Sequence, residues 1–439
     1  MLLSGRIYHT FPTVVIGLIF ALQADAATID EALLKTYQHS KVLAATKQDV
    51  ESSKLGIHAA YGNWLPHISA GASRRKATYD PDVGHDYRLK QQTLTVSQQL
   101  FNGGASVASL KRAKATLNAS KAQLDITEQQ TLLQAAQTYI DLYLTEEAVR
   151  IFENRVKLLE EHLQGIKVRF EVGEATITAL AETEAGQAQA EAHLAATKGK
   201  LASLREQYQQ LTGEMPQNLV KPNPHIPLPS TIEHATQLAL NANPELAKAY
   251  ANLDITKAEV TSAQANILPR ITLDYQISKD RYNHDFSHNN RNTHTTILNL
   301  SVPIFQRGQE HVQLKQSKLN REKHRLVAAN TKELIANTVQ AKWHQWISSQ
   351  AKLRATEKQL RAAEVAFNGT QQEYSHGLKS NLDYRQAEHN LFQAQLDSLT
   401  SYSQEILSRY DLFASMGQLT AEKLFADTSK ATPTTNKES

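Results

Sequence analysis

Two parts of the chain alternate apolar with polar residues. Between residues 271 and 277 every second side chain is apolar, and residues 293–304 repeat this alternation. A period of two is typical of a β-strand with one apolar face. Residues 94–100 show the same pattern earlier in the chain, with residues 67–78 as a weaker partner. Because polar, turn-rich segments connect the members of each pair, the sequence predicts two β-hairpins and four strands.

A different period follows each predicted hairpin. Apolar side chains then recur at alternating spacings of three and four residues, at Val149, Phe152, Val156, Leu159, Leu163, Ile166 and Phe170. This 3.5-residue period is typical of a coiled coil, and it recurs with smaller side chains 204 residues later. A helix over residues 104–170 would be roughly 100 Å long. We expect each rod to turn at a glycine, Gly173 or Gly377, and a second helix to return along it.

The two halves of the chain read as copies of one unit. The motif NWLP at 63–66 recurs as NILP at 266–269, an offset of 203 residues. LTVSQQLFNGG at 94–104 recurs as LNLSVPIFQRG at 298–308, an offset of 204 residues. Weak identity with constant spacing indicates an internal duplication. The expected divisions are a first repeat at 27–220, a proline-rich linker at 221–230, a second repeat at 231–419 and a disordered tail at 420–439.

The strand-to-helix transitions are similar in the two copies. Each returning strand ends in an aromatic residue that is followed by glycine, where a barrel strand would become a helix. Both aromatic residues are also expected at a membrane interface, where such side chains are common. The residues assigned to these junctions are Phe101, Gly103, Gly104, Pro303, Phe305 and Gly308.

The first 26 residues are typical of a secretory signal peptide. A basic start leads into a run of about a dozen apolar residues, and Ala24 and Ala26 mark a cleavage site. The chain has no cysteine, which excludes a lipid-anchored N-terminus, a disulfide scaffold and thiolate chemistry. Beyond the signal, no apolar stretch is long enough for a membrane-spanning helix. A net charge of +3 argues against a nucleic-acid partner.

Four strands are too few to close a membrane barrel, and unpaired backbone groups at an open edge each cost several kcal/mol in lipid. The chain is therefore expected to assemble. Three copies would supply twelve strands, with a tube of twelve helices beneath them. The sequence thus predicts an internally duplicated α+β membrane protein, with a long α-helical coiled-coil barrel and four β-strands per protomer in a trimeric twelve-stranded transmembrane β-barrel.

With these elements in this order, the chain resembles the TolC-like outer-membrane efflux proteins. The likeness rests on the NPEL motif at 243–246, the two Leu-Pro junctions, the FNGG and FQRG junctions and the YSHG turn at 374–377. It covers about residues 29–419. One departure is that Ser40 and Lys41 stand where the second copy has Asn-Pro, so the first helix break must be made differently or be absent.

The resemblance implies a homotrimeric duct through the outer membrane and periplasm. Such a duct serves as the passive exit of a tripartite drug efflux pump or of type I protein secretion. The implied partners are outer-membrane lipid, a periplasmic adaptor (a membrane fusion protein) and an inner-membrane transporter of the RND or ABC type. Small molecules and secreted proteins remain open alternatives for the cargo.

The resemblance also implies a gate at the coiled-coil ends. In the family an acidic constriction follows the glycine turn, and here Asp383 matches its first position and Gln386 its second. Three copies of Asp383 would form a ring that attracts cations. The same residue equally fits the start of a helix, where a carboxylate caps the N-terminus.

Two further positions match residues that tie the closed end of the family's tunnel to the neighbouring coil. They are Tyr374 and Lys379, whose implied partners are Thr178 and Ala179. The side chain of Ala179 cannot accept a hydrogen bond. The latch of the closed state is therefore in doubt, or it is rebuilt from Glu174, Thr176 or Glu182.

The sequence offers little catalytic or cofactor chemistry. Residues 280–294 read as an outward-facing loop, and their spacing of candidate ligands, His284, Asp285, His288 and His294, matches no standard metal site. No phosphate-binding loop or nucleophile motif occurs. We therefore expect no enzyme activity, cofactor or metal. The competing interpretation is a periplasmic coiled-coil adaptor or structural protein without a membrane barrel.

Overall fold

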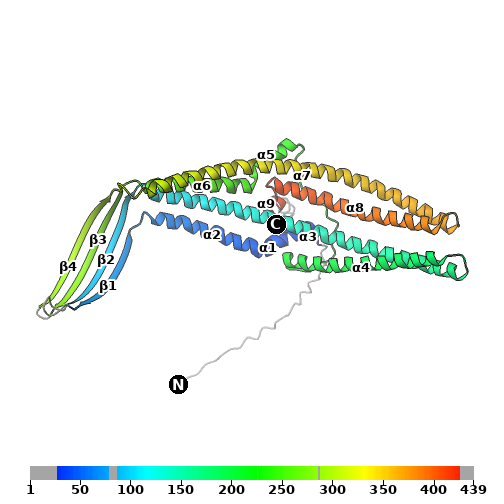
Figure 1. Cartoon of the computed structure of the whole chain (residues 1–439), viewed down its shortest axis with the longest axis horizontal. Coiled ribbons are helices and arrows are strands. Elements are labelled where there is room, and N and C mark those ends of the chain that lie inside the picture. Colours follow the sequence, from blue (N-terminus) through cyan, green and yellow to red (C-terminus); the bar gives the residue numbers. More distant parts are fainter. Residues whose placement is uncertain (1–26, 79–86, 225, 285–286, 426–439) are drawn as a thin grey trace, which may run out of the picture.

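The computed structural model describes residues 27–78, 87–224, 226–284 and 287–425. They form a long helical rod with a curved sheet at one end (Figure 1). The elements are α1 (Ile29–His39), α2 (Lys41–Gly62), β1 (His67–Ala77), β2 (Tyr87–Asn102), α3 (Ala105–Glu171), α4 (Ile177–Thr212), α5 (Ile232–Ala242), α6 (Pro244–Ala265), β3 (Arg270–His284), β4 (Ser287–Ser301), α7 (Gln309–Ser375), α8 (Asn381–Ser415) and α9 (Ala421–Phe425). The second half repeats the order of elements of the first, and the long helices α3 and α7 both have 67 residues. The predicted duplication is confirmed.

The four strands form one antiparallel sheet in the order β1-β2-β3-β4. β2 and β3 join the two repeats, with Leu94 opposite Ile277. The second hairpin is longer than expected, because its ladder continues until His284 lies opposite Ser287. The prediction of a loop over 280–294 was therefore wrong. Backbone hydrogen bonds hold these strands together although their side chains are polar. The periodicity of apolar side chains does not reveal such pairing.

The helices form a wall that is four helices wide along its whole length. Near the sheet, α2 packs on α3, α3 on α6 and α6 on α7. Toward the far end, α4 takes the place of α2 and α8 that of α6, so that the order becomes α4, α3, α8 and α7 (Figure 1). The two 67-residue helices therefore run through both halves, and each level of the wall has two outer edges.

The best-buried core lies midway along the rod, where the short helices change. Leu132, Tyr139 and Tyr410 are fully buried there. The Tyr139 hydroxyl lies 2.7 Å from the carbonyl oxygens of both Ala27 and Val220 and donates toward them. This side chain therefore fastens both ends of the first repeat to the middle of α3.

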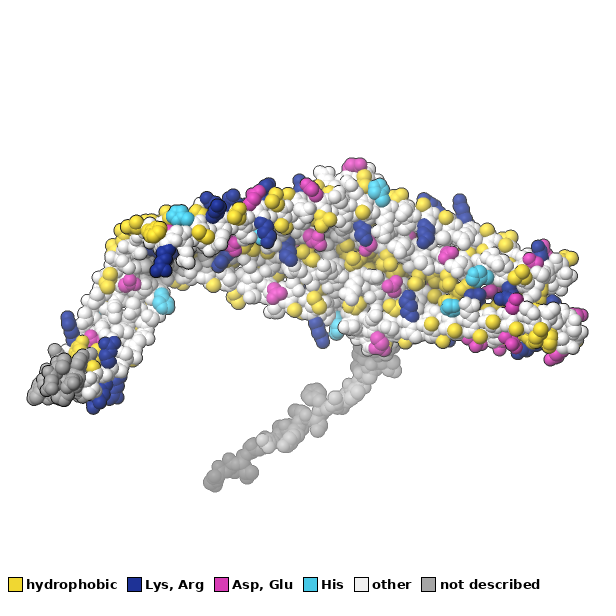
Figure 2. All heavy atoms as spheres, viewed as in Figure 1, with side chains coloured by type: hydrophobic (Ala, Val, Ile, Leu, Met, Phe, Trp, Pro, Cys, Tyr) yellow, Lys and Arg dark blue, Asp and Glu magenta, His cyan; other side chains and the backbone are white. Residues whose placement is uncertain are grey.

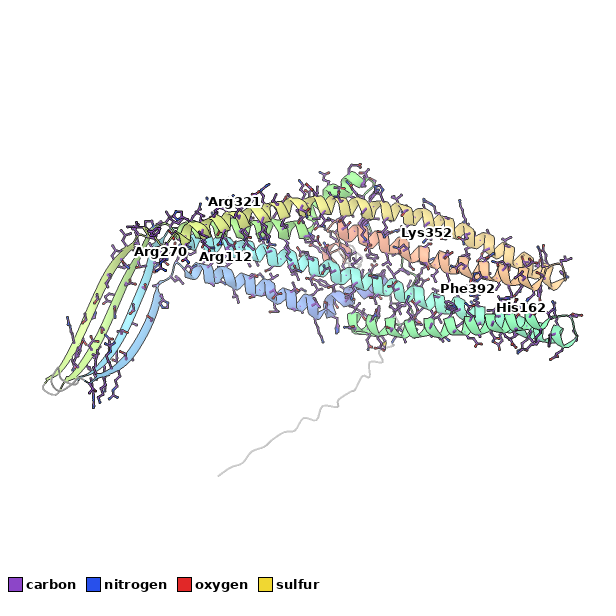
Figure 3. The ribbon with its side chains drawn as sticks, viewed as in Figure 1. Arg112, His162, Arg270, Arg321, Lys352 and Phe392 are labelled. Carbon is purple, nitrogen blue, oxygen red and sulfur yellow. The ribbon has the colours of Figure 1, made fainter. Side chains whose placement is uncertain are left out.

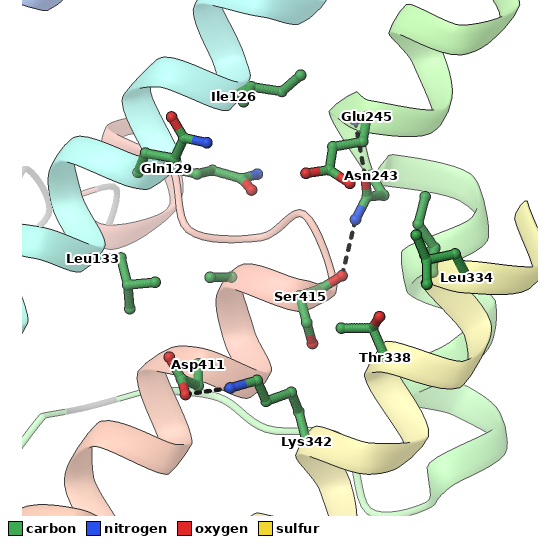
Figure 4. A pocket seen from close by; sticks show the side chains of 13 residues that line it. Ile126, Gln129, Leu133, Asn243, Glu245, Leu334, Thr338, Lys342, Asp411 and Ser415 are labelled. Atoms are coloured by element: carbon green, nitrogen blue, oxygen red, sulfur yellow. Dashed lines mark hydrogen bonds and ion pairs between the residues drawn. The ribbon is translucent and has the colours of Figure 1, made fainter. Parts of the chain in front are cut away.

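Each repeat breaks its first helix after eleven residues. In the second repeat, Asn243 Oδ1 accepts from the Glu245 amide at 2.9 Å, and Asn243 Nδ2 donates to the Ser415 carbonyl at 3.0 Å, on the wall of a cavity of about 280 Å³ (Figure 4). In the first repeat, the side chain of Ser40 accepts from the Leu43 amide at 3.2 Å. The break is thus present in both copies. Ser40 caps the N-terminus of α2 in the first repeat, whereas Asn243 caps α6 in the second repeat and Pro244 is its first residue.

The segment after α8 is folded back on the rod. Leu419 is fully buried, and the Ala421 amide donates to Glu128 Oε1 at 2.7 Å. Residues 421–425, expected to belong to a disordered tail, instead form α9. The remainder of that tail, 426–439, and the predicted signal peptide, 1–26, lie outside the described residues. Within the described segments, no helix has the length and apolar character that crossing a membrane requires.

Candidate gate at the coiled-coil ends

Both coiled coils turn at a glycine with a left-handed backbone. The φ angle is +80° at Gly173 and +76° at Gly377, a region that costs an L side chain roughly 1–2 kcal/mol. The amides that follow, of Glu174 and Leu378, donate back to carbonyl oxygens of α3 and α7 at 2.7 and 2.8 Å. These bonds satisfy carbonyls that would otherwise be left free at the helix ends. The two tips therefore share one backbone motif.

Asp383 caps the N-terminus of α8. Its Oδ2 accepts from the Ser380 amide at 3.0 Å and from the Ser380 hydroxyl at 2.7 Å, and the Asp383 amide donates to Ser380 Oγ at 3.2 Å. The hydroxyl and amide of Ser380 hold the pKa of this carboxyl below its ordinary value. The side chain is exposed, so its negative charge remains accessible to solvent at neutral pH.

The other residues expected at the gate are mostly exposed to solvent. Lys379, Thr178 and Gln386 are exposed, and Ala179 is half-buried. The Ala179 amide donates to Thr176 Oγ1 at 3.1 Å. Thr176, one of the alternatives for a rebuilt latch, therefore serves as the N-cap of α4 within its own protomer.

Tyr374 is held by α3 of the same protomer. Arg169 Nη1 donates to Tyr374 Oη at 3.2 Å, and the Arg169 guanidinium carbon lies 5.0 Å from the centroid of the Tyr374 ring. The same ring lies 5.7 Å from His162 and 5.1 Å from Tyr384, between centroids. Tyr374 thus contacts residues of α3 and α8. The partners that the resemblance implied for it lie at the start of α4.

His162 is the centre of this contact between α3 and α8. Its ring stacks on Tyr384, and its Nε2 lies 2.8 Å from Asn381 Oδ1. Burial lowers the pKa of His162, the hydrogen bond to Asn381 opposes that shift, and the charges of Arg169 and Arg385 add to it. The imidazole is therefore neutral at neutral pH.

Two ion pairs extend the contact along α8. Arg155 Nε lies 2.9 Å from Glu388 Oε1, with side chains only 16% and 6% exposed, and the Arg155 guanidinium lies 3.9 Å over the ring of Phe392. Figure 3 shows Phe392 in this far part of the rod. Nearer the tip, Arg385 Nη1 donates to Glu182 Oε2 at 2.8 Å. Glu182, a second alternative for the latch, thus joins α4 to α8 within one protomer.

Sequence reasoning missed most of these partners. Arg155, His162 and Arg169 are spaced seven residues apart on α3, which places them on one face of a coiled-coil helix. Asn381 and Glu388 on α8 are seven apart as well. This seven-residue spacing of basic and polar residues could have indicated that α3 and α8 pack through them. A pattern of apolar positions alone does not include these residues.

The strand-to-helix junctions use left-handed backbone in both copies. In the first, φ is +66° at Gly103 and +91° at Gly104, and a Cβ on Gly103 would lie 2.6 Å from the Ala265 carbonyl oxygen. In the second, the equivalent pair is Arg307, with φ +59°, and Gly308, with φ +74°. The aromatic residues of both junctions, Phe101 and Phe305, are exposed, and Pro303 lies between β4 and α7.

The candidate metal ligands of the second hairpin fall on different elements. His284 ends β3, His288 and His294 lie in β4, and Asp285 lies outside the described residues. His294 Nδ1 is 3.1 Å from the Tyr275 hydroxyl. Across the described residues, no three His, Asp or Glu side chains gather as a metal site requires.

Both repeats match known proteins. A family model described as "Outer membrane efflux protein" matches residues 32–214 and, a second time, residues 235–418. The chain belongs to the outer membrane efflux protein family. This efflux protein is 24% identical over 404 residues to Outer membrane efflux protein BepC of Brucella suis biovar 1, which covers 91% of this chain and 88% of BepC. It is 31% identical over 158 residues to Alkaline protease secretion protein AprF of Pseudomonas aeruginosa, covering 36% of this chain and 33% of AprF.

Solved structures share the fold of the efflux protein at low sequence identity. The outer membrane protein VceC from Vibrio cholerae gives a TM-score of 0.77 at 18% identity, over 89% of this chain and 96% of that chain. CusC gives a TM-score of 0.79 at 16% identity, over 89% of this chain and 92% of that one. The predicted combination of a long helical barrel segment with four strands is therefore confirmed.

The efflux protein is an outer-membrane channel that extends into the periplasm and serves as the exit duct of an efflux or type I secretion system. The competing interpretation, a periplasmic adaptor without membrane strands, is set aside by the family match over both repeats. The family consists of channel proteins.

Proposed function

We propose that three copies of this chain close into one passive duct, with twelve strands above and twelve helices across each level below. The observation that carries the proposal is that the sheet and the helical wall of the protomer each have two free edges, one formed by the first repeat and one by the second. Among the described strands β1 pairs only with β2, and β4 only with β3. Near the sheet, α2 and α7 are likewise the outer helices of the wall. An open sheet edge is costly in lipid, so each edge needs a partner.

The duplication predicts which surfaces meet. Inside the protomer, α3 of the first repeat packs on α6 of the second, and Ala115 and Ala258 line the seam between them. The residues at the equivalent places are Leu319 on α7 and Leu55 on α2. These leucines are 62% and 66% exposed, whereas the alanines are 6% and 3% exposed. Repetition of the same packing between copies would bury Leu319 of one protomer against Leu55 of the next.

The exposed face of α7 supports this arrangement over several turns. Val312, Leu319 and Leu326 recur every seven residues and are all exposed. Their equivalents on α3 are alanines at 108, 115 and 122, and all three are buried within the protomer. Burying a large apolar side chain stabilises an interface by roughly 1.5–3 kcal/mol. Such a face repeated at three interfaces is a substantial drive for assembly.

The two glycine tips are suited to docking a periplasmic adaptor. Val172 and Ile177 flank one tip, and Leu378 and Leu382 the other, and all four side chains are exposed. Exposed apolar residues gathered at a rod's end are typical of a protein interface. An adaptor bound there would connect the duct to an inner-membrane transporter of the RND or ABC type, which supplies the energy and selects the cargo.

The gate follows from the same assembly. Three exposed Asp383 carboxylates at the constriction would form one acidic ring, with Gln386 as a neutral second position. Arg169, Tyr374 and His162 hold the two coils of each protomer together in the closed arrangement. Opening would separate α8 from α3, and it would therefore break these contacts.

The assembly is tested by crosslinking, because the chain has no native cysteine. Leu55→Cys combined with Leu319→Cys should give covalent dimers and trimers on oxidation in outer-membrane fractions. Leu55→Cys combined with Val365→Cys is the matched control, because Val365 is also exposed on α7 but lies near the far tip. Monomer alone from the first pair, or equal crosslinking of the control pair, would contradict the proposal.

A further inference from the structure

One face of the sheet ends in a dense group of cations. Side chains alternate between the two faces along each strand, and the pairing register then places six basic residues on a common face of β1, β2 and β3. All six are exposed, and Figure 2 shows Lys and Arg side chains gathered at the end of the sheet farthest from the helices. We call this set the basic belt: Arg74, Lys76, Arg88, Lys90, Lys279 and Arg281.

The strand register places like charges of the belt directly opposite each other on neighbouring strands. Arg74 lies opposite Lys90, and Lys90 in turn lies opposite Arg281 on the next strand. Like charges directly opposite each other destabilise a sheet. Among the described strand residues, no Asp or Glu falls on this face to offset them. The other face is arranged differently, since Asp280 lies opposite Arg291 there. Within the described strands, the positive charge of the belt is therefore not offset, and the belt attracts anions.

The belt lies immediately beyond an apolar band. On the same face, β3 carries Ile271, Leu273 and Ile277, and Lys279 and Arg281 follow two and four residues later. At about 3.3 Å per residue, these cations lie roughly 7 and 13 Å past the last apolar side chain. The helices, which extend into the periplasm, leave the sheet at its opposite end. The belt therefore lies at the height of the headgroups in the outer leaflet.

The shape of the surface fits a phosphate group. A hollow of about 270 Å³ lies within the belt, and Arg74, Lys90, Lys279 and Arg281 are among the residues that line it. Guanidinium groups offer two parallel donors to a phosphate, and lysine adds a mobile point charge. Several cations converging on one hollow favour an anion with more than one charge.

We propose that the basic belt binds the phosphate groups of a phosphorylated glycolipid in the outer leaflet. This role goes beyond the exit duct, because it concerns the lipid-facing surface and not the cargo path. Bound phosphates offset the repulsion across β1, β2 and β3, and they set the depth of the sheet in the membrane. The lipid is thus a structural ligand of the channel.

The test measures lipid bound to the purified, assembled channel by native mass spectrometry, with bisphosphorylated lipid A as the probe and its dephosphorylated form as the comparison. Lys90→Gln with Arg281→Gln should weaken binding of the phosphorylated form about tenfold or more. Arg75→Gln with Arg291→Gln removes two cations from the opposite face at the same height and should leave binding unchanged.

Three results would overturn the proposal: equal loss in both double variants, equal binding of dephosphorylated lipid A by the unmodified channel, or complete displacement of the lipid by excess inorganic phosphate, which would mark a site for free anions. Because all four substituted side chains are exposed, assembly should persist. Salt provides an independent measurement on the unmodified chain, since binding of phosphorylated lipid A should weaken as ionic strength rises.

Discussion

The imidazole of His162 lies face to face with the phenol ring of Tyr384, with ring centroids 4.5 Å apart and planes inclined by 24°. This contact joins α3 of the first repeat to α8 of the second. Burial, together with the nearby charge of Glu388, raises the pKa of Tyr384 to about 12, so the phenol stays neutral. A proton on His162 would place a third cation beside Arg169 and Arg385, in a site where burial already disfavours charge. We therefore expect the contact to weaken as the pH falls.

The first prediction concerns this sensitivity. Because the pKa of His162 in the packed coil lies below its ordinary value of 6.5, the separated coils take up a proton more readily than the packed ones. The stabilisation is complete above pH 6.5 and is lost as the pH falls from 6.5 toward the lowered pKa. Conductance in planar bilayers should therefore rise between about pH 7.5 and about pH 5.5.

His162→Gln should remove most of that rise, because glutamine can still bond to Asn381 but does not take up a proton in this range. The matched control is His389→Gln, which changes an exposed histidine on α8, the helix that carries Asn381. An identical pH response in the His162 variant and in the unmodified channel would rule out His162 as the sensor.

The second prediction concerns the buried pair of Arg155 and Glu388. Glu388→Leu leaves the Arg155 guanidinium buried without its carboxylate, and breaking such a pair costs about 3–5 kcal/mol. Adding Arg155→Leu should recover most of the loss, because two apolar residues can replace a buried ion pair at little cost. The measurement is amide hydrogen exchange in the far halves of α3 and α8.

A more exposed pair on α3 serves as the control. Arg150 Nη1 lies 2.9 Å from Glu147 Oε1, and their side chains are 69% and 28% exposed, well above the exposure of Arg155 and Glu388. Glu147→Leu should therefore change stability by less than about 1 kcal/mol. If the double variant at 155 and 388 is as unstable as Glu388→Leu alone, the loss comes from altered packing and not from the orphaned charge.

Much of the fold could be predicted because it depends on local periodicity. The spacing of three and four residues from Val149 to Phe170 follows from helix geometry, and the limits expected for the first rod agree with α3 within a residue. The glycine turns at 173 and 377 could also be predicted, since a left-handed backbone favours glycine. These features need no knowledge of distant contacts.

The contacts between the two coils at the candidate gate could not be predicted in the same way. Tyr374 bonds to Arg169, 205 residues away, and His162 to Asn381, 219 residues away. Periodicity shows which face of a helix is packed but does not identify the neighbour. The resemblance suggested a partner on α4, whereas the structure shows that Tyr374 accepts a hydrogen bond from Arg169 on α3. The loop expected over 280–294 failed for a related reason, because strand pairing there depends on backbone and not on side-chain pattern.

The third prediction compares the two strand-to-helix junctions. Gly103→Ala should destabilise the channel more than Gly104→Ala, because both have positive φ but only a Cβ at 103 would clash, 2.6 Å from the Ala265 carbonyl oxygen. Arg307 is the equivalent of Gly103, and its φ of +59° is a costly conformation for an arginine. Arg307→Gly should therefore stabilise by about 1 kcal/mol. Thermal dissociation of the assembled channel in detergent measures all three, and equal effects of the two alanine variants would contradict this account.

The fourth prediction separates the two roles of Asp383. Asp383→Asn removes the charge of the proposed ring but keeps an oxygen that can accept from Ser380. Ser380→Ala does the reverse, since it removes the capping hydroxyl and keeps the carboxylate. If the ring attracts cations, the asparagine variant should lose cation selectivity in planar bilayers, while the alanine variant should keep it and lose about 0.5–2 kcal/mol of stability at the start of α8. Unchanged selectivity in Asp383→Asn would leave Asp383 with the capping role alone, and the constriction would then have to be formed by other residues of the tips.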